Sequence, residues 1–166
     1  TKDCSSAATG SSVFDFDGDG SAEVLYGDEQ RLRIYKGSDG SILWDTCNTS
    51  GTLREFPVVA DVDNDGHADI VAVSNSYSSI SCDGTKQRGI RVFGDSEGNW
   101  VRTRRVWNQH AYSVTNVNED GSIPAPQPVN WTTPGLNNFR QNAQPEGEFS
   151  APDLIVSVRQ QCMPLD

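Results

Sequence analysis

The sequence predicts an all-β fold built from two four-stranded antiparallel units, with an irregular C-terminal extension that ends in a strand. Three observations lead to this prediction. Two acidic stretches align without gaps, two later strand-like stretches align in the same order, and apolar residues alternate with polar ones within the strand-like stretches. Two matches in the same order are typical of a duplicated supersecondary unit.

The duplication can be followed residue by residue. The stretch FDFDGDGSAEVLY begins at Phe14, and ADVDNDGHADIVAV begins at Ala60. A shift of 46 positions (61 − 15) places every acidic residue of the first stretch on an acidic residue of the second. Further on, LRIYKGSDGSIL from Leu32 matches IRVFGDSEGNWV from Ile90 at a shift of 58 (90 − 32), so the second unit carries an insertion around residues 75–89.

Each unit contains four stretches with strand character. In the third stretch of the first unit, Leu32 and Ile34 alternate with Arg31, Arg33 and Tyr35, which gives one apolar face. The predicted strands occupy residues 12–16, 23–27, 31–36 and 42–45 in the first unit, and residues 58–62, 69–74, 89–93 and 100–106 in the second.

Four antiparallel strands in a repeat of roughly 45–55 residues are typical of a β-propeller blade. We therefore expect a lead-in at residues 1–11, a first blade at 12–46, a second blade at 47–107, and the extension at 108–166. Closed propellers have about four to eight blades, so two blades alone do not close a ring. The chain is expected to be a piece of a longer protein, to be capped by its extension, or to associate with other copies.

Each acidic loop has the composition of a calcium site. Carboxylates stand at loop positions 1, 3, 5 and 9, and a glycine at position 6 permits the sharp turn that closes the loop. With a backbone carbonyl at position 7, these groups form an all-oxygen shell, which suits Ca²⁺ better than Mg²⁺ because Mg²⁺ keeps its waters. The predicted ligands are Asp15, Asp17, Asp19, Ser21 and Glu23 in the first loop, and Asp61, Asp63, Asp65, His67 and Asp69 in the second.

An EF-hand and a third acidic stretch are the alternatives that the acidic pattern raises. An EF-hand requires a bidentate glutamate at position 12, where this chain has Tyr26 and Ala72. A third stretch, NVNEDGSIP, places Asn116, Asn118 and Asp120 at positions 1, 3 and 5, but proline stands at its position 9. We interpret this third stretch as a polar turn and keep it as a weaker metal candidate.

Charge and cysteine content narrow the class of protein. The formal net charge of −10 argues against nucleic acid as a partner, and no apolar run approaches the roughly 18 residues of a membrane helix. The even number of cysteines, without CxxC spacing, indicates disulfides and an oxidising compartment. Three pairings can be drawn, of which we expect Cys47–Cys82 with Cys4–Cys162, although the sequence does not choose among them.

The pattern DxDxDGxx(D/E) between two strands, with Phe56-Pro57 before the second copy, resembles the FG-GAP repeats of integrin α-subunit propellers and related bacterial adhesion proteins. The resemblance covers residues 12–107, although neither blade preserves the GAP element itself. It implies that each loop joins the first two strands of a blade and binds one structural Ca²⁺. It also implies an extracellular protein used in adhesion or recognition. The APDLIV stretch near the C-terminus is similar to the opening strand of Ig-like adhesion domains, and equally suits a blade-completing or inter-subunit strand.

The predicted function is binding to a protein or glycan partner at a cell surface, without catalysis. His110 is the best candidate for a catalytic side chain, but a histidine beside aromatic residues is the more frequent situation. The first alternative is a self-assembling filament subunit, and the second is a lectin with Trp100, Trp107, Trp131 or Tyr112 as sugar platforms. A third is an accessory domain of a larger hydrolase. The basic cluster of Arg102, Arg104 and Arg105 is expected on the solvated face of a strand, with an anionic glycan contact as its alternative.

Overall fold

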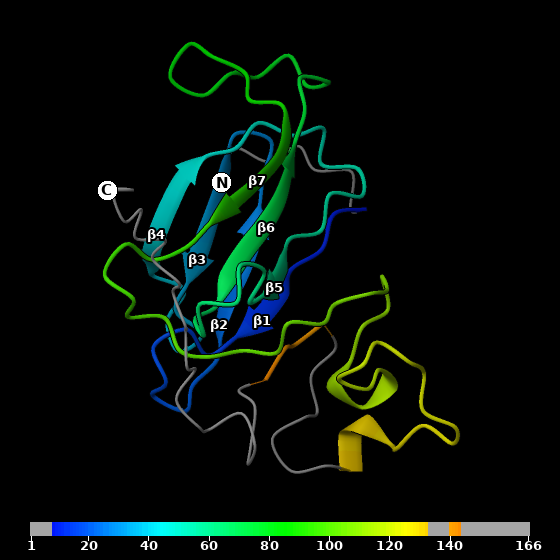
Figure 1. Cartoon of the computed structure of the whole chain (residues 1–166). Helices are drawn as coiled ribbons and strands as arrows, with labels where there is room; N and C mark the ends of the chain where they lie inside the picture. The colour runs from blue at the N-terminus through cyan, green and yellow to red at the C-terminus, as the bar shows by residue number, and fades with distance from the viewer. Residues whose placement is uncertain (1–7, 133–139, 144–166) are drawn as a thin grey trace, which may run out of the picture.

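The computed structural model describes residues 8–132 and 140–143 of the 166-residue chain. Figure 1 shows two antiparallel sheets laid face to face, with irregular chain at one end of the strands. The first sheet has the order β1-β2-β3-β4 and the second has the order β5-β6-β7. The strands are β1 (Ser12–Phe14), β2 (Glu23–Gly27), β3 (Arg31–Tyr35), β4 (Ile42–Cys47), β5 (Val58–Ala60), β6 (Asp69–Ser74) and β7 (Gly89–Phe93).

The all-β prediction and the first seven strands are confirmed, but the expected fourth strand of the second unit is wrong. Residues 100–106 pair with no strand and instead cross the ends of both sheets. Two hydrogen bonds explain this course, because Val101 N–H donates to the carbonyl of Phe16, and Ala68 N–H donates to the carbonyl of Val101. The second sheet therefore has three strands, and over the described residues the two sheets do not close into a ring.

The two units repeat the same register. Leu25 lies opposite Ile34 in the first sheet, and their equivalents Val71 and Val92 lie opposite each other in the second. The pairing of β1 with β2 is repeated in the same way by β5 and β6. Because a one-residue slip would exchange the faces of a strand, this agreement fixes which side chains of the two units are equivalent.

One hydrophobic core lies between the sheets. The first sheet contributes Phe14, Leu25, Leu32 and Ile34, and the second contributes Val59, Ile70 and Ala72. Aromatic rings close the core at one side, where Trp44 packs edge-on against Phe93 at 5.4 Å between ring centroids. Burial of these side chains supplies most of the free energy that holds the two units together.

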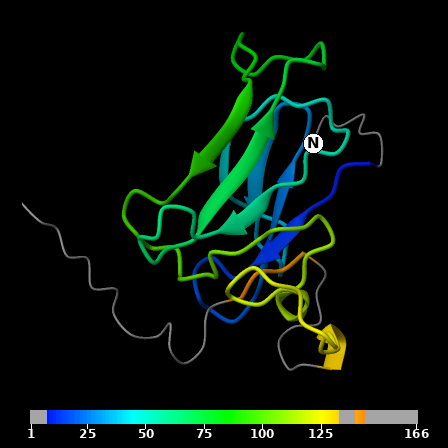
Figure 2. The same ribbon diagram turned by 45° about the vertical axis from the view of Figure 1, so that its right-hand side comes forward.

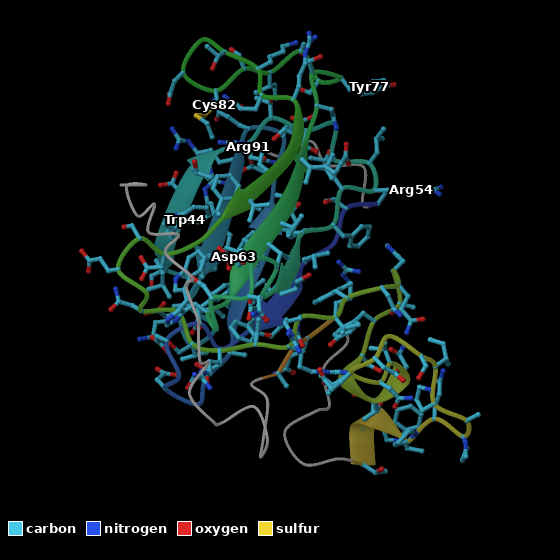
Figure 3. All side chains as sticks on the ribbon, viewed as in Figure 1. Trp44, Arg54, Asp63, Tyr77, Cys82 and Arg91 are labelled. Carbon is cyan, nitrogen blue, oxygen red and sulfur yellow. A yellow bond between two sulfur atoms is a disulfide. The ribbon has the colours of Figure 1, made fainter. Side chains whose placement is uncertain are left out.

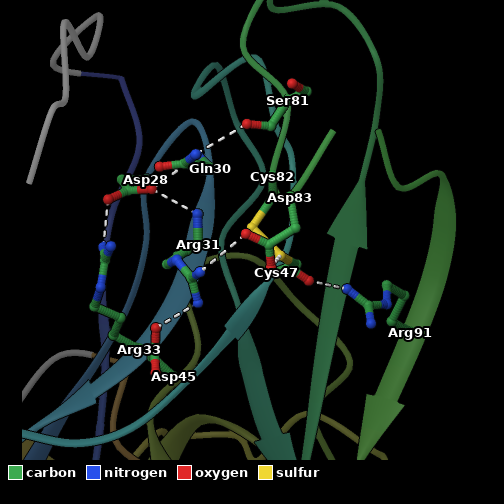
Figure 4. Close-up of polar contacts among 10 residues, drawn as sticks. All are labelled: Asp28, Gln30, Arg31, Arg33, Asp45, Cys47, Ser81, Cys82, Asp83 and Arg91. Carbon is green, nitrogen blue, oxygen red and sulfur yellow. Dashed lines mark hydrogen bonds and ion pairs between the residues drawn. A yellow bond between two sulfur atoms is a disulfide. The ribbon is translucent and has the colours of Figure 1, made fainter. Parts of the chain in front are cut away.

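A disulfide joins the units at the end opposite the acidic loops. Cys47 closes β4, and Cys82 lies in the insertion of the second unit, so the predicted Cys47–Cys82 bond is confirmed. In Figure 4 this bond lies beside Arg91, whose guanidinium donates to the Cys47 carbonyl. The other predicted pair, Cys4–Cys162, lies outside the described residues.

Ion pairs brace the first sheet close to this disulfide (Figure 4). Arg33 pairs with Asp28, and their side chains are only 12% and 4% exposed. Burial raises the pKa of Asp28, but hydrogen bonds from Arg33 and from the backbone N–H groups of Arg31 and Gln30 outweigh it. The pKa of Asp28 is therefore lowered.

The described part of the extension contains two 3-10 helices, η1 (Val114–Asn116) and η2 (Asn130–Thr132). It is held to the sheets through Tyr112, which is fully buried and donates to the Asn142 amide oxygen at 2.9 Å. Burial raises the pKa of Tyr112 to about 12. Asn142 in turn donates to the carbonyls of Val59 and Arg104, which fastens the extension to the second unit. The predicted terminal strand at residues 153–158 lies outside the described residues.

Figure 2 shows from a second side that strands and irregular chain dominate the described residues. Neither of the short helices described above has the length or the apolar character to cross a membrane.

Candidate metal sites

The two acidic loops occupy equivalent places in the fold. The first joins β1 to β2 and the second joins β5 to β6, so each connects the first two strands of its unit. Both lie at the end of the sheets crossed by residues 100–105, which hydrogen-bond to the chain at both loops. In Figure 3 the labelled Asp63 marks the second loop, far from the disulfide at Cys82.

The loops gather carboxylate oxygens at the spacing that a calcium ion needs. Oxygens of Asp15, Asp17 and Asp19 all lie within 4.8 Å of one another. Two oxygens bound to the same Ca²⁺ are at most about 5 Å apart, because each bond is roughly 2.3–2.6 Å long. The same limit of 4.8 Å holds for Asp61, Asp63 and Asp69 in the second loop. The donor sets thus fit a hard divalent cation.

The two groups share positions 1 and 3 but differ in their third member. In the first loop it is Asp19 at position 5, whereas in the second it is Asp69 at position 9. The carboxylates of Asp65 and Glu23 are not members of these groups. The structure therefore brings six of the eight predicted carboxylates together, and the ligand roles of the other two remain predictions.

Backbone hydrogen bonds shape both loops in the same way. The position 1 carboxylate, Asp15, accepts from the N–H groups of Gly18 at 2.8 Å and Gly20 at 3.0 Å. Asp61 accepts from Asn64 at 2.7 Å and from Gly66 at 3.3 Å. The carboxylates at positions 3 and 5 each accept from the N–H two residues later, again in both loops. The sequence repeat is thus also a repeat of conformation.

Sequence reasoning identified the glycine at position 6 but missed a second special backbone position. Gly20 and Gly66 have φ of 86° and 87°, as the turn at position 6 requires. Position 4 is also left-handed, with φ of 73° at Gly18 and 64° at Asn64. The available signal was the residue type, because glycine and asparagine are the residues that tolerate this conformation best.

The carboxylates at position 9 are buried, with Glu23 1% and Asp69 6% exposed, and Asp61 at position 1 is buried to the same degree as Asp69. Glu23 accepts a hydrogen bond from Phe16 N–H at 2.9 Å, and Asp69 accepts one from Val62 N–H at 3.0 Å. Burial, followed by the charges of the neighbouring aspartates, raises the pKa of Glu23 and of Asp69. Burial also raises the pKa of Asp61. A bound cation would relieve this cost, because it offsets the repulsion among the carboxylates.

At position 7 the ring of His67 is engaged elsewhere. Its Nδ1 lies 2.8 Å from the carbonyl oxygen of Trp100, within hydrogen-bond distance. His67 would therefore bind a cation through its backbone carbonyl, as Ser21 would in the first loop. Both carbonyl ligands remain predictions.

Comparison with known proteins shows a similarity between this region and a known repeat. Residues 15–72 match the FG-GAP-like repeat. This part of the chain is therefore similar to an FG-GAP-like repeat. The match spans both acidic loops and strands β2 to β5, so the resemblance seen in the sequence is confirmed.

The fold around the FG-GAP-like repeat also resembles a solved structure. The crystal structure of the V. cholerae biofilm matrix protein Bap1 matches with a TM-score of 0.71 and 33% sequence identity. The match covers 84% of this chain and 23% of the Bap1 chain, so the present chain spans less than a quarter of that protein. Among curated proteins, none matches the chain.

The third acidic stretch differs at position 1 from the hydrogen-bond pattern of the two loops. At its position 1, Asn116 accepts from Ser113 N–H at 3.1 Å and from Gln109 at 2.6 Å. Its amide group thus completes the turn at η1. Asp120 at position 5 accepts from Ser122 N–H, as position 5 does in the two loops, and also from the Ser122 hydroxyl. These contacts favour the turn interpretation, and metal binding at this stretch has no support beyond the sequence pattern.

The expected solvated basic cluster is wrong for Arg104, which is only 6% exposed. Its guanidinium donates to Tyr112 at 3.2 Å and to the carbonyls of Val114 and Val117 at 2.9 and 2.8 Å, and it pairs with Glu119. Arg104 thus fastens the extension to the second unit. Arg105 is exposed and donates to Asn64 of the second loop at 2.7 Å.

The proposed sugar platforms differ in accessibility. Trp131 is 76% exposed, whereas Tyr112 is fully buried and stacks on Trp107 with 4.2 Å between ring centroids. Trp100 packs on Phe16 and borders an open cavity of about 450 Å³ that the first acidic loop also reaches through Asp17 and Glu23. His110, the candidate catalytic residue, packs edge-on against Phe56 at 4.7 Å between ring centroids.

Proposed function

We propose that this chain is an extracellular, calcium-stabilised adhesion or structural module whose two sheets are propeller-type blades. The observation that carries the proposal is the duplication of the acidic loop, down to its backbone hydrogen bonds. Two loops that hold carboxylate oxygens within 4.8 Å of one another, in equivalent positions of a repeat, are best explained by a shared cation ligand. The family match and the similarity to a biofilm matrix protein support this role.

Calcium in this proposal serves structure. Each ion would fasten the connection between the first two strands of its blade, and residues 100–105 would hold the two loops together through the hydrogen bonds of Val101 and Arg104. The surface so stiffened would bind a protein or glycan partner, with no bond made or broken. The disulfide supports an oxidising, extracellular location.

Calcium titration tests the metal part of this proposal. Isothermal calorimetry of the apo-protein with CaCl₂ should show two sites, with dissociation constants of roughly 10⁻⁴ to 10⁻³ M, as is ordinary for extracellular modules. MgCl₂ at the same concentrations is the control and should bind more weakly. Absence of any calcium heat up to about 10 mM, a concentration well above that range, would overturn the proposal.

The lectin alternative retains one specific observation in its favour, which is the cavity beside Trp100 and the first loop. Glycan-array binding of the wild-type chain in calcium and in EDTA tests it. Calcium-dependent glycan binding that is lost in Trp100→Ala, while the Trp131→Ala variant binds normally, would support a sugar site at this cavity. Binding of no glycan would leave a protein partner as the proposed one.

A further inference from the structure

The outward face of the second sheet is apolar and exposed. Val73, Ile90 and Val92 are 43%, 76% and 53% exposed. The register places them on one face with Val58 and Val71, because directly paired residues point to the same side of a sheet. We call these five residues the outer face of the second sheet. Aliphatic side chains gathered in this way on a soluble protein mark an interaction surface.

The duplication identifies what kind of surface this is. The shifts of 46 and 58 positions that align the two units carry Leu25, Leu32 and Ile34 onto Val71, Ile90 and Val92. Leu25, Leu32 and Ile34 are at most 2% exposed, because they form the face by which the first sheet packs on the second. The exposed face is therefore a second copy of a packing surface that the chain already uses once.

The complementary surface has a counterpart in the first unit, although Tyr26 stands there in place of the core residue Ala72. Within the chain, the face that receives the first sheet is formed by residues that include Val59, Ile70 and Phe93. Their equivalents in the first unit are Val13, Val24 and Tyr35, which lie together on the outward face of the first sheet. Ile42 pairs with Tyr35 and extends this face, and it is 54% exposed. We call these four residues the outer face of the first sheet.

Among the described residues after β7, 94–132 and 140–143, no strand covers the exposed face. Residues 94–132 contain no strand and two 3-10 helices, and residues 100–105 are occupied at the acidic loops. The surface with the matching pattern is instead the outer face of the first sheet, on the opposite side of the molecule. One chain cannot bring these two faces together, but two chains can.

We infer that the outer face of the second sheet docks on the outer face of the first sheet of a second copy of this chain, in the arrangement that the two sheets have within one chain. The two surfaces differ, so the contact is head-to-tail and generates a ring or an open filament. This inference deepens the structural role proposed above by naming a partner, but it depends on the sheet faces and not on bound calcium.

Sedimentation velocity and light scattering of the wild-type chain in calcium test the inference, over concentrations from about 1 to 500 μM that span weak to moderate affinities. The average mass should rise with concentration beyond that of a dimer. Ile90→Asp blocks one face and Ile42→Asp blocks the other, and each alone should weaken self-association at least tenfold. Ile123→Asp is the matched control, because Ile123 is also 54% exposed but lies on neither face, and it should associate like wild type.

A mixing experiment tests the direction of the contact. Equal amounts of Ile90→Asp and Ile42→Asp retain one intact pair of faces between them, so the mixture should form a dimer and nothing larger. A cooperative thermal unfolding transition like that of the wild type shows that each variant is folded, and Ile90→Lys repeats the test with a different charge.

Three results would overturn the inference: a wild-type chain that is monomeric at every concentration, association that neither aspartate variant weakens, or two monomeric variants that fail to pair on mixing. If the outer face of the second sheet instead packs against a further repeat of a longer chain, the wild-type chain would be monomeric at every concentration. Monomeric protein with normal calcium binding would reject this inference alone. Concentration-dependent assembly without calcium binding would reject the calcium proposal alone.

Discussion

Replacing Asp63 by asparagine tests the second calcium site with little disturbance of the loop. Asp63 is exposed at position 3, and its carboxylate accepts one hydrogen bond, from Asp65 N–H at 3.1 Å. The side-chain oxygen of asparagine can accept the same bond, so the substitution removes a charge and keeps the local conformation. Asp63 also contributes to the repulsion that raises the pKa of Asp61 and Asp69.

The expected magnitude follows from mass action. With calcium about 100-fold above the dissociation constant, each site adds about 2.7 kcal/mol to the free energy of unfolding. For a domain of this size, 1 kcal/mol corresponds to about 2–4 °C, so two sites should raise the melting temperature by about 10–20 °C. Asp63→Asn should lose about half of this rise. In EDTA it should melt at or slightly above the wild-type temperature, because one repulsive charge is gone.

Differential scanning calorimetry in EDTA and in 10 mM CaCl₂ measures both quantities. Asn64→Gly is the matched control, because glycine accepts the left-handed backbone at position 4 and the loop charge is unchanged. It should keep the full calcium-induced rise. An Asp63→Asn protein with the wild-type rise would refute the second site. An equal loss of stability in EDTA and in calcium would show that Asp63 acts only through the structure of the loop.

Three further predictions concern stability. Replacing Cys47 and Cys82 together by serine should cost about 4 kcal/mol, the chain-entropy value for a loop closed by residues 35 apart, and an unchanged urea midpoint would contradict it. Because the pKa of Asp28 is lowered, its ion pair with Arg33 stabilises the fold above about pH 4, the ordinary pKa of aspartate. This stabilisation is lost as the pH falls further. Urea melts at several pH values should therefore show Asp28→Asn less stable than wild type at pH 7, with the difference shrinking below about pH 4; a constant difference would exclude this linkage. Arg104→Ala removes the contacts that fasten the extension, so limited proteolysis should cut residues 108–132 faster while the sheets survive, and equal cutting rates would assign Arg104 no anchoring role.

The sequence by itself determined the strands of the first unit and the place of the acidic loops. Strand β3 was readable because Leu32 and Ile34 alternate with polar neighbours, a local pattern that directly reports one buried face. The loops could be predicted because a tight turn needs glycine at position 6. Carboxylates at alternate positions of such a short loop also point toward a common centre. Both features depend on contacts within about ten residues, which a sequence pattern records.

The tertiary structure alone decided the course of residues 100–106 and the role of Arg104. As a local pattern, this segment matches the fourth strand of the first unit. In the folded chain its backbone groups bond instead to Phe16, Asp61 and Ala68, all more than thirty residues earlier. Arg104 was expected in solvent but is buried among carbonyl groups of the extension. Such choices depend on which distant backbone groups need partners once the sheets have packed, and no local pattern carries that information.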